Sequence, residues 1–181
     1  AERDGAALRA AAAWGGGCPL EVDASAGACR VVRPGGELDL GAIGKGWALD
    51  CAAAVLGEHG VACALLHGGT SSVLGVGGPW RVGLGVAPAG DGASGPVVEL
   101  CGSALGVSES RGRVVGGHGH VLDPRGGASA PMEGAGGWSA VTGPSAAVCD
   151  ALSTAVLVDR SVGGRLPEGY DVVCAGVPAC V

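Results

Sequence analysis

The chain is organised around residues Leu38–Asp50, which read LDLGAIGKGWALD. This segment opens with an apolar alternation typical of a strand end, turns through Gly41, Gly44 and Gly46, and continues into a helix pattern. Backbone N–H groups at a helix N-terminus lack intrahelical partners, glycine lets an anion approach them, and Lys45 adds a positive charge. Such a turn can bind a phosphate. The spacing alone favours a plain strand–helix corner with a solvated lysine, because it is neither a P-loop nor a dinucleotide fingerprint.

Composition limits the class of protein. The 181 residues fit one domain, and 48% are hydrophobic while only 3% are aromatic, so alanine, valine and leucine must fill the core. The 38 glycines lack the period of three that collagen requires. A net charge of −6 with scattered basic residues argues against a nucleic-acid partner. No apolar run reaches the roughly 20 residues of a membrane span.

The order of predicted elements indicates an α+β fold with a mostly antiparallel sheet and two main helices. One helix is predicted from about Lys45 to His59, closed by Gly60, and another from Pro144 or Ser145 to about Val158. Strand patterns cover Ala28–Val32, Leu38–Leu40, Ala62–Leu66, Ser72–Val76, Trp80–Val86, Val97–Leu100, Ala104–Val107, His120–Leu122, Trp138–Thr142 and Tyr170–Cys174. We expect the first two to pair as a hairpin and Ala62–Leu66 to be buried.

Eight cysteines occur without a C-x-x-C pair, so a zinc ribbon is not predicted. Cys51, Cys63 and Cys149 stand inside apolar patterns, and we expect them to be small buried hydrophobes. Their spacing leaves disulfide pairing open.

Three motifs in order resemble the ApbE family, the FAD:protein FMN transferases. Residues 39–50 are similar to the family's D-L/F-G-G-I-A-K-G-Y-A-V-D, HVLDPRGG at 120–127 to H-I-I-D-P-R-T-G, and AVCDALSTA at 147–155 to A-x-x-A-D-A-x-A-T-A. The resemblance covers roughly residues 14–158, the C-terminal half or more of a family member, with the motifs in 38–158. It implies that residues 1–181 form one ApbE-like, T-fold-like domain without the family's N-terminal portion. One side of the flavin site is then expected to stay open, with weak FAD binding.

Asp150 and Thr154 stand four apart on the second predicted helix, so they share one face and can both reach a hard cation. The residues alone favour a solvated aspartate and a threonine bonded to a backbone carbonyl. The resemblance implies that Asp150 and Thr154 bind Mg²⁺ together with a backbone carbonyl near Gly44. We expect Asp150 on the helix surface, where its replacement by alanine leaves the fold intact.

The resemblance also implies a set of FAD-binding residues from two of the motifs and one strand: Gly41, Lys45, Gly46, Ser108 and His120. His120 is the candidate base that takes a proton from an attacking hydroxyl, and His118 is its rival two residues earlier. A histidine there can instead cap a strand. Asp123 is expected to fix the following turn rather than to do chemistry.

The implied function is Mg²⁺-dependent transfer of FMN from FAD to a threonine or serine hydroxyl of a target flavoprotein, with release of AMP. Glu109 follows Ser108 where the family has glycine, Thr70 stands where it usually has aspartate, and Gly126 where it has threonine. An alternative is a non-catalytic flavin-binding module or an inactive fragment of a transferase, and a third is a glycine-rich structural domain. Family members are often exported or lipid-anchored, but the sequence shows no signal peptide, so the compartment stays open.

Overall fold

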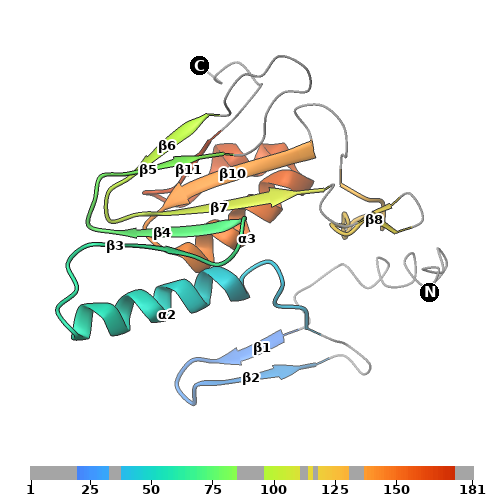
Figure 1. Cartoon of the computed structure of the whole chain (residues 1–181). Coiled ribbons are helices and arrows are strands. Elements are labelled where there is room, and N and C mark those ends of the chain that lie inside the picture. Colours follow the sequence, from blue (N-terminus) through green and yellow to red (C-terminus); the bar gives the residue numbers. More distant parts are fainter. Residues whose placement is uncertain are drawn as a thin grey trace.

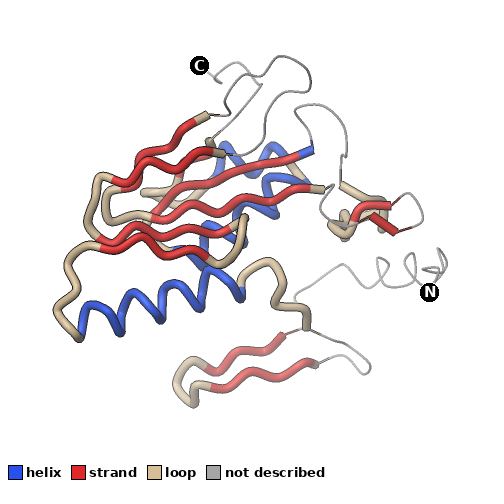
Figure 2. Tube along the Cα trace, in the orientation of Figure 1, coloured by secondary structure: helices blue, strands red, loops and turns tan. Residues whose placement is uncertain are grey.

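The computed structural model of the protein describes residues 20–32, 38–84, 96–110, 114–115, 118–130 and 137–173. Its centre is a five-stranded antiparallel sheet with the strand order β11-β10-β7-β4-β3. The helices α2 (Gly44–Glu58) and α3 (Ala146–Val158) pack against one face of this sheet (Figures 1 and 2). The predicted α+β class, with an antiparallel sheet and two main helices, is therefore confirmed. No helix in the described ranges is long and apolar enough to cross a membrane.

The remaining elements are short. The strands of the central sheet are β3 (Ala64–His67), β4 (Ser72–Val76), β7 (Ala104–Glu109), β10 (Trp138–Gly143) and β11 (Asp171–Val172). Three separate two-stranded ladders join β1 (Leu20–Asp23) to β2 (Ala28–Val31), β5 (Trp80–Gly83) to β6 (Val97–Leu100), and β8 (Val114–Val115) to β9 (His118–Gly119). A 3₁₀ helix, η2 (Arg160–Arg165), follows α3.

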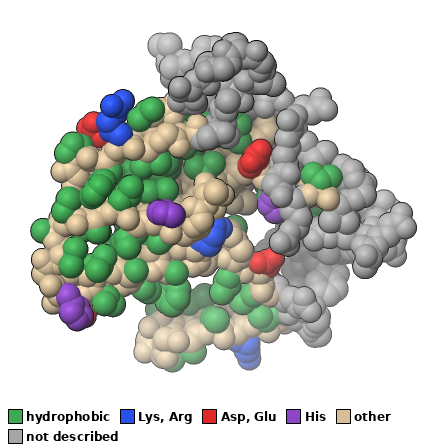
Figure 3. Space-filling view, viewed as in Figure 1, with side chains coloured by type: hydrophobic (Ala, Val, Ile, Leu, Met, Phe, Trp, Pro, Cys, Tyr) green, Lys and Arg blue, Asp and Glu red, His purple; other side chains and the backbone are tan. Residues whose placement is uncertain are grey.

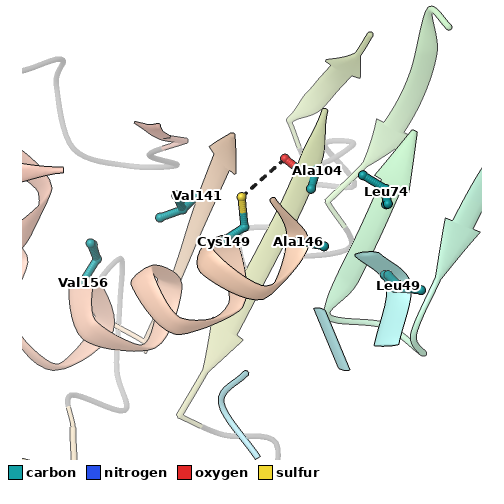
Figure 4. Close-up of a cluster of buried hydrophobic side chains, with 7 residues drawn as sticks. All are labelled: Leu49, Leu74, Ala104, Val141, Ala146, Cys149 and Val156. Carbon is teal, nitrogen blue, oxygen red and sulfur yellow. Dashed lines mark hydrogen bonds between the residues drawn. The ribbon is translucent and has the colours of Figure 1, made fainter. Parts of the chain in front are cut away.

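Side-chain alternation along β7 separates two cores. Ala104 faces the helices, and Leu105 packs with Leu100 of β6 in a second core on the opposite face. Gly106 faces α3 so closely that a Cβ there would lie 2.4 Å from the carbonyl carbon of Cys149. Glycine therefore lets α3 lie directly on the sheet. The buried residues of the helix-side core are Leu49, Leu74, Ala104, Val141, Ala146, Cys149 and Val156 (Figure 4).

The predicted hairpin at the start of the chain is wrong in its pairing. Residues 38–40 form no strand, and β2 pairs with β1 instead. A local turn decides this, because Asp23 Oδ1 accepts hydrogen bonds from Ser25 N–H, Ser25 Oγ–H and Ala26 N–H, and Gly27 adopts a φ of +59°.

Other local predictions need smaller corrections. His120–Leu122 is not a strand; His118 and Gly119 form β9, and Leu122 makes only an isolated bridge to Ser129. β3 lies at the sheet edge and alternates in exposure, so the expected buried strand is half solvated. Cys51 and Cys63 are exposed, whereas Cys149 is buried as expected. The ends of the predicted strands at residues 85–86 and 174 lie outside the described residues.

Candidate functional site

Asp150 connects the third motif to the glycine turn of the first. Its side chain on α3 is only 4% exposed. Oδ2 accepts a hydrogen bond from the Gly46 N–H at 2.8 Å, and Oδ1 accepts one from Ser72 Oγ at 2.7 Å. The expected position on the helix surface is therefore wrong, because the close packing of α3 on the sheet buries this residue.

Hydroxyl groups continue the site along α3. Ser108 Oγ on β7 lies 2.8 Å from Thr154 Oγ1 and 2.8 Å from Ser153 Oγ. Thr154 Oγ1 and Ser153 Oγ also donate to the Asp150 carbonyl, at 3.3 and 2.9 Å. Ser139 donates to the Ser153 carbonyl from β10. The face of α3 that carries Asp150 and Thr154 therefore presents a connected set of oxygen atoms.

Gly46 brings α2 against the start of α3. A Cβ on this residue would lie 2.1 Å from the Ala146 carbonyl oxygen, so only glycine fits here without movement. Asp50, one turn further along α2, contacts the same end of α3: its carboxylate accepts bonds from the Ala146 N–H at 2.8 Å, the Ala147 N–H at 3.0 Å and Ser145 Oγ at 2.7 Å. The turn in the first motif thus serves helix packing as well as any ligand.

The oxygen atoms around Asp150 fit a hard divalent cation. Within the described ranges, no lysine, arginine or histidine pairs with this buried carboxylate, which receives hydrogen bonds only from neutral donors. A buried charge without a counterion is costly, and a carboxylate that accepts two hydrogen bonds keeps lone pairs. The same ranges contain no cluster of three His, Cys, Asp or Glu residues that could hold a metal. Mg²⁺ characteristically needs only one or two carboxylates beside water and substrate phosphate.

The other predicted ligands, at residues 41, 44 and 45 of the turn, form no hydrogen bond with the Asp150 side chain within the described ranges. Gly44 is the first residue of α2, half-buried. Gly41 donates its N–H to Asp39 Oδ1 at 2.7 Å. Lys45 is exposed, and its Nζ lies 3.3 Å from the Gly41 carbonyl oxygen. The N–H groups of Gly41 and Gly46 thus have protein acceptors, and the lysine ammonium remains at the surface.

His120 is exposed just after β9, and no described residue forms a hydrogen bond with its side chain. Its motif is attached to the end of α3 through Arg125, which donates to Asp123 and, at 2.7 Å, to Asp159 Oδ2. The Arg125 hydrogen bond keeps the pKa of the Asp123 carboxyl below its usual value. Asp123 also accepts the Gly127 N–H on its carbonyl at 2.7 Å, which confirms that it fixes the turn.

Large hydrophobic side chains are exposed around the glycine turn, beside the exposed Asp39 and Lys45. Leu40 and Trp47 are each 63% exposed, and Leu38 and Ile43 are also exposed. In the space-filling view, hydrophobic side chains are spread over the face that is turned to the viewer, with few charged side chains between them (Figure 3).

Sequence reasoning missed two contacts that shape the site. Ser72 begins β4 and has no motif of its own, so only the fold places it beside Asp150. Asp50 ends the first motif, and no local pattern points to its hydrogen-bond partners. These partners are Ser145–Ala147, about a hundred residues further along the chain.

Comparison with known proteins follows the same motifs. The sequence model of the ApbE family matches residues 3–166. A solved ApbE protein from Thermotoga maritima has a TM-score of 0.71 and 28% identity, with 86% of this chain and 53% of that chain covered. The flavinyl transferase ApbE of Pseudomonas stutzeri, in its apo form, has a TM-score of 0.59 and 25% identity, with 87% and 54% covered.

The flavin transferase ApbE of Vibrio cholerae, with a TM-score of 0.67, 22% identity and coverage of 87% and 56%, supports the fold alone. The chain spans about half the length of these solved structures. No curated protein sequence matches it significantly.

Proposed function

The chain belongs to the ApbE family, and from this premise we propose that it transfers FMN from FAD to a threonine or serine hydroxyl of a target flavoprotein. The observation that carries the proposal is the buried Asp150 carboxylate. It lies against the Gly46 N–H, one helical turn from Thr154, without a counterion among the described residues. Such a site suits a reaction that builds negative charge on a phosphate.

In the proposed reaction, the acceptor hydroxyl oxygen forms a bond to the FMN phosphorus of FAD. The bond from that phosphorus to the AMP oxygen breaks, AMP leaves, and the hydroxyl proton passes to a base. His120 is the proposed base, because it is exposed to an incoming peptide and an imidazole nitrogen can accept the hydroxyl proton. His118 remains the rival for this role.

The chain's own residues have separate tasks in this proposal. Asp150 and Thr154, with a backbone carbonyl near Gly44, would hold Mg²⁺, and Ser108 keeps the Thr154 hydroxyl in place. When bound, Mg²⁺ would stabilise negative charge on the phosphoryl oxygens. Lys45 holds the phosphate by its ammonium, since the nearby Gly41 and Gly46 N–H groups already have acceptors.

The proposal is tested by incubating the protein with FAD, MgCl₂ and a peptide that carries one acceptor threonine, and then weighing the peptide. A gain of one FMN that requires the threonine and is lost with EDTA supports it. A matched peptide with valine in place of threonine is the control. FAD binding without any peptide modification would favour the alternative, a flavin-binding module without transfer activity. We retain this alternative because the chain spans only about half the length of the solved transferases.

A further inference from the structure

Asp50 caps a helix other than its own. Its Oδ1 accepts the Ala146 N–H, and its Oδ2 accepts the Ala147 N–H and the Ser145 hydroxyl. Ser145 Oγ accepts the Val148 N–H at 3.3 Å in turn. These bonds satisfy the first N–H groups of α3, which have no acceptor within that helix. A carboxylate of α2 therefore completes the N-terminus of α3.

Asp150 does the converse. Its carboxylate on α3 accepts the Gly46 N–H in the first turn of α2, where the N-cap residue Ile43 offers no side-chain acceptor. Each helix thus places a carboxylate at the positive end of the other helix dipole. The helices also lie close together here, because a Cβ on Gly46 would be 2.1 Å from the Ala146 carbonyl oxygen.

We propose that Asp50 is a positioning residue for Asp150. By holding the start of α3 against α2, Asp50 keeps the Asp150 carboxylate on the Gly46 N–H and the Ser72 hydroxyl. It thereby keeps the face of α3 that carries Asp150 and Thr154 in a fixed place for a divalent cation. The statement about the cation rests on the proposed function; the statement about the two helices does not.

The test uses Asp50→Asn, which keeps the size of the side chain. An amide has one acceptor oxygen and an NH₂ group that cannot accept the second backbone N–H. Amide hydrogen exchange, followed by NMR on the folded protein, should become about tenfold faster at Gly46, since bonds to a charged acceptor are the stronger ones. Val82→Ala, in the second core across the sheet, is the control for general destabilisation and should leave Gly46 exchange unchanged.

Exchange that accelerates only at Ala146 and Ala147, with Gly46 unchanged, would overturn the proposal and reduce Asp50 to a local cap. If Asp50→Asn does not fold, Ser145→Ala removes one partner of Asp50 and should produce a smaller acceleration at Gly46. Faster exchange at Val148 with no change at Gly46 in that variant would likewise overturn the proposal.

Titration with MgCl₂ by calorimetry distinguishes the positioning role of Asp50 from the proposed metal site. If the wild-type protein binds Mg²⁺, Asp50→Asn should weaken binding about tenfold, as supporting residues of metal sites do. Unchanged affinity would overturn the positioning role. If the wild-type protein binds no Mg²⁺, the proposed metal site fails, and exchange at Gly46 alone decides the role of Asp50.

Discussion

Ser108 Oγ lies 2.8 Å from Thr154 Oγ1, so a hydroxyl of the central strand β7 holds the side chain proposed to bind the metal. The Thr154 hydroxyl also lies 3.3 Å from the Asp150 carbonyl oxygen. Two contacts therefore fix its rotamer before any ligand arrives. The resemblance to the family implies that Ser108 touches the flavin, whereas its observed contacts point inward to α3.

Replacement of Ser108 by alanine should weaken Mg²⁺ binding more than Mg²⁺-free FAD binding, because the change releases Thr154. The lost hydrogen bonds should also lower the free energy of unfolding by about 1 kcal/mol. Calorimetric titrations with MgCl₂ and with FAD measure the first effect and urea unfolding the second. Ser161→Ala, an exposed hydroxyl on η2, is the matched control. Loss of FAD affinity with normal Mg²⁺ binding would restore the direct flavin contact.

Replacement of Asp150 by asparagine should remove Mg²⁺ binding and also destabilise the fold. The Gly46 N–H and the Ser72 hydroxyl each lose a charged acceptor in a buried position. We expect a loss of about 1–3 kcal/mol in the free energy of unfolding, measured with urea. Asp171→Asn, at an exposed position of β11, should leave both quantities unchanged. Wild-type stability in Asp150→Asn would show that the carboxylate belongs to solvent rather than to the helix interface.

Replacement of Gly46 by alanine should cost about 1–3 kcal/mol of stability, because the new methyl group would overlap the Ala146 carbonyl 2.1 Å away. Gly57→Ala on the same helix is the matched control. A Cβ there meets no atom within 4 Å, and the change should stabilise the helix by about 0.4–1 kcal/mol. Thermal or urea unfolding of the two variants compares them directly. Equal effects would mean that the two helices separate easily at this contact.

The helices were predictable because their ends carry local signals. Gly60 adopts a φ of +75° just past α2, and Ser145 caps α3 by accepting the Val148 N–H. The bounds of β4 agree with the strand predicted at Ser72–Val76. The first hairpin was not predictable from apolar patterns, since the polar turn at Asp23–Gly27 decided the pairing.

The candidate site likewise was predictable only in part. That Asp150 and Thr154 share a face follows from their spacing along one helix, and both residues lie on α3. The burial of Asp150 does not follow from spacing, because it depends on Gly106 admitting α3 to the sheet. The role of Asp50 likewise needs the packing of α2 against α3, which no local pattern encodes.

His120 should act on the rate of transfer rather than on binding. If it is the base, His120→Ala should lower the FMN transfer rate about 10²–10⁴-fold while the affinity for FAD changes little. Single-turnover mass measurements and fluorescence titration with FAD separate the two quantities. His118→Ala is the comparison variant. A larger loss of rate in that variant would move the base to β9, and equal losses of rate and affinity in His120→Ala would make His120 a binding residue.

Cys149 should make stability fall at alkaline pH. Burial, with smaller contributions from the nearby Asp150 and Asp50 carboxylates, raises the pKa of its thiol to about 12. In the unfolded chain this thiol ionises at its ordinary pKa of about 8.5. The free energy of unfolding therefore falls as the pH rises from about 8.5 towards 12, and the thiol has no effect on it at lower pH. Urea unfolding between pH 7 and pH 10.5 should therefore show a steeper decline for the wild type than for Cys149→Ala.

The exposed Cys51 provides the control, because Cys51→Ala should keep the wild-type slope. In the native protein at pH 8, a thiol reagent should modify Cys51 and Cys63 quickly and Cys149 only when the chain unfolds, since the reactive form is the thiolate. Rapid native labelling of Cys149 would mean that α3 leaves the sheet readily. In that case the Asp150 carboxylate on the same helix could not be held in one place for a metal.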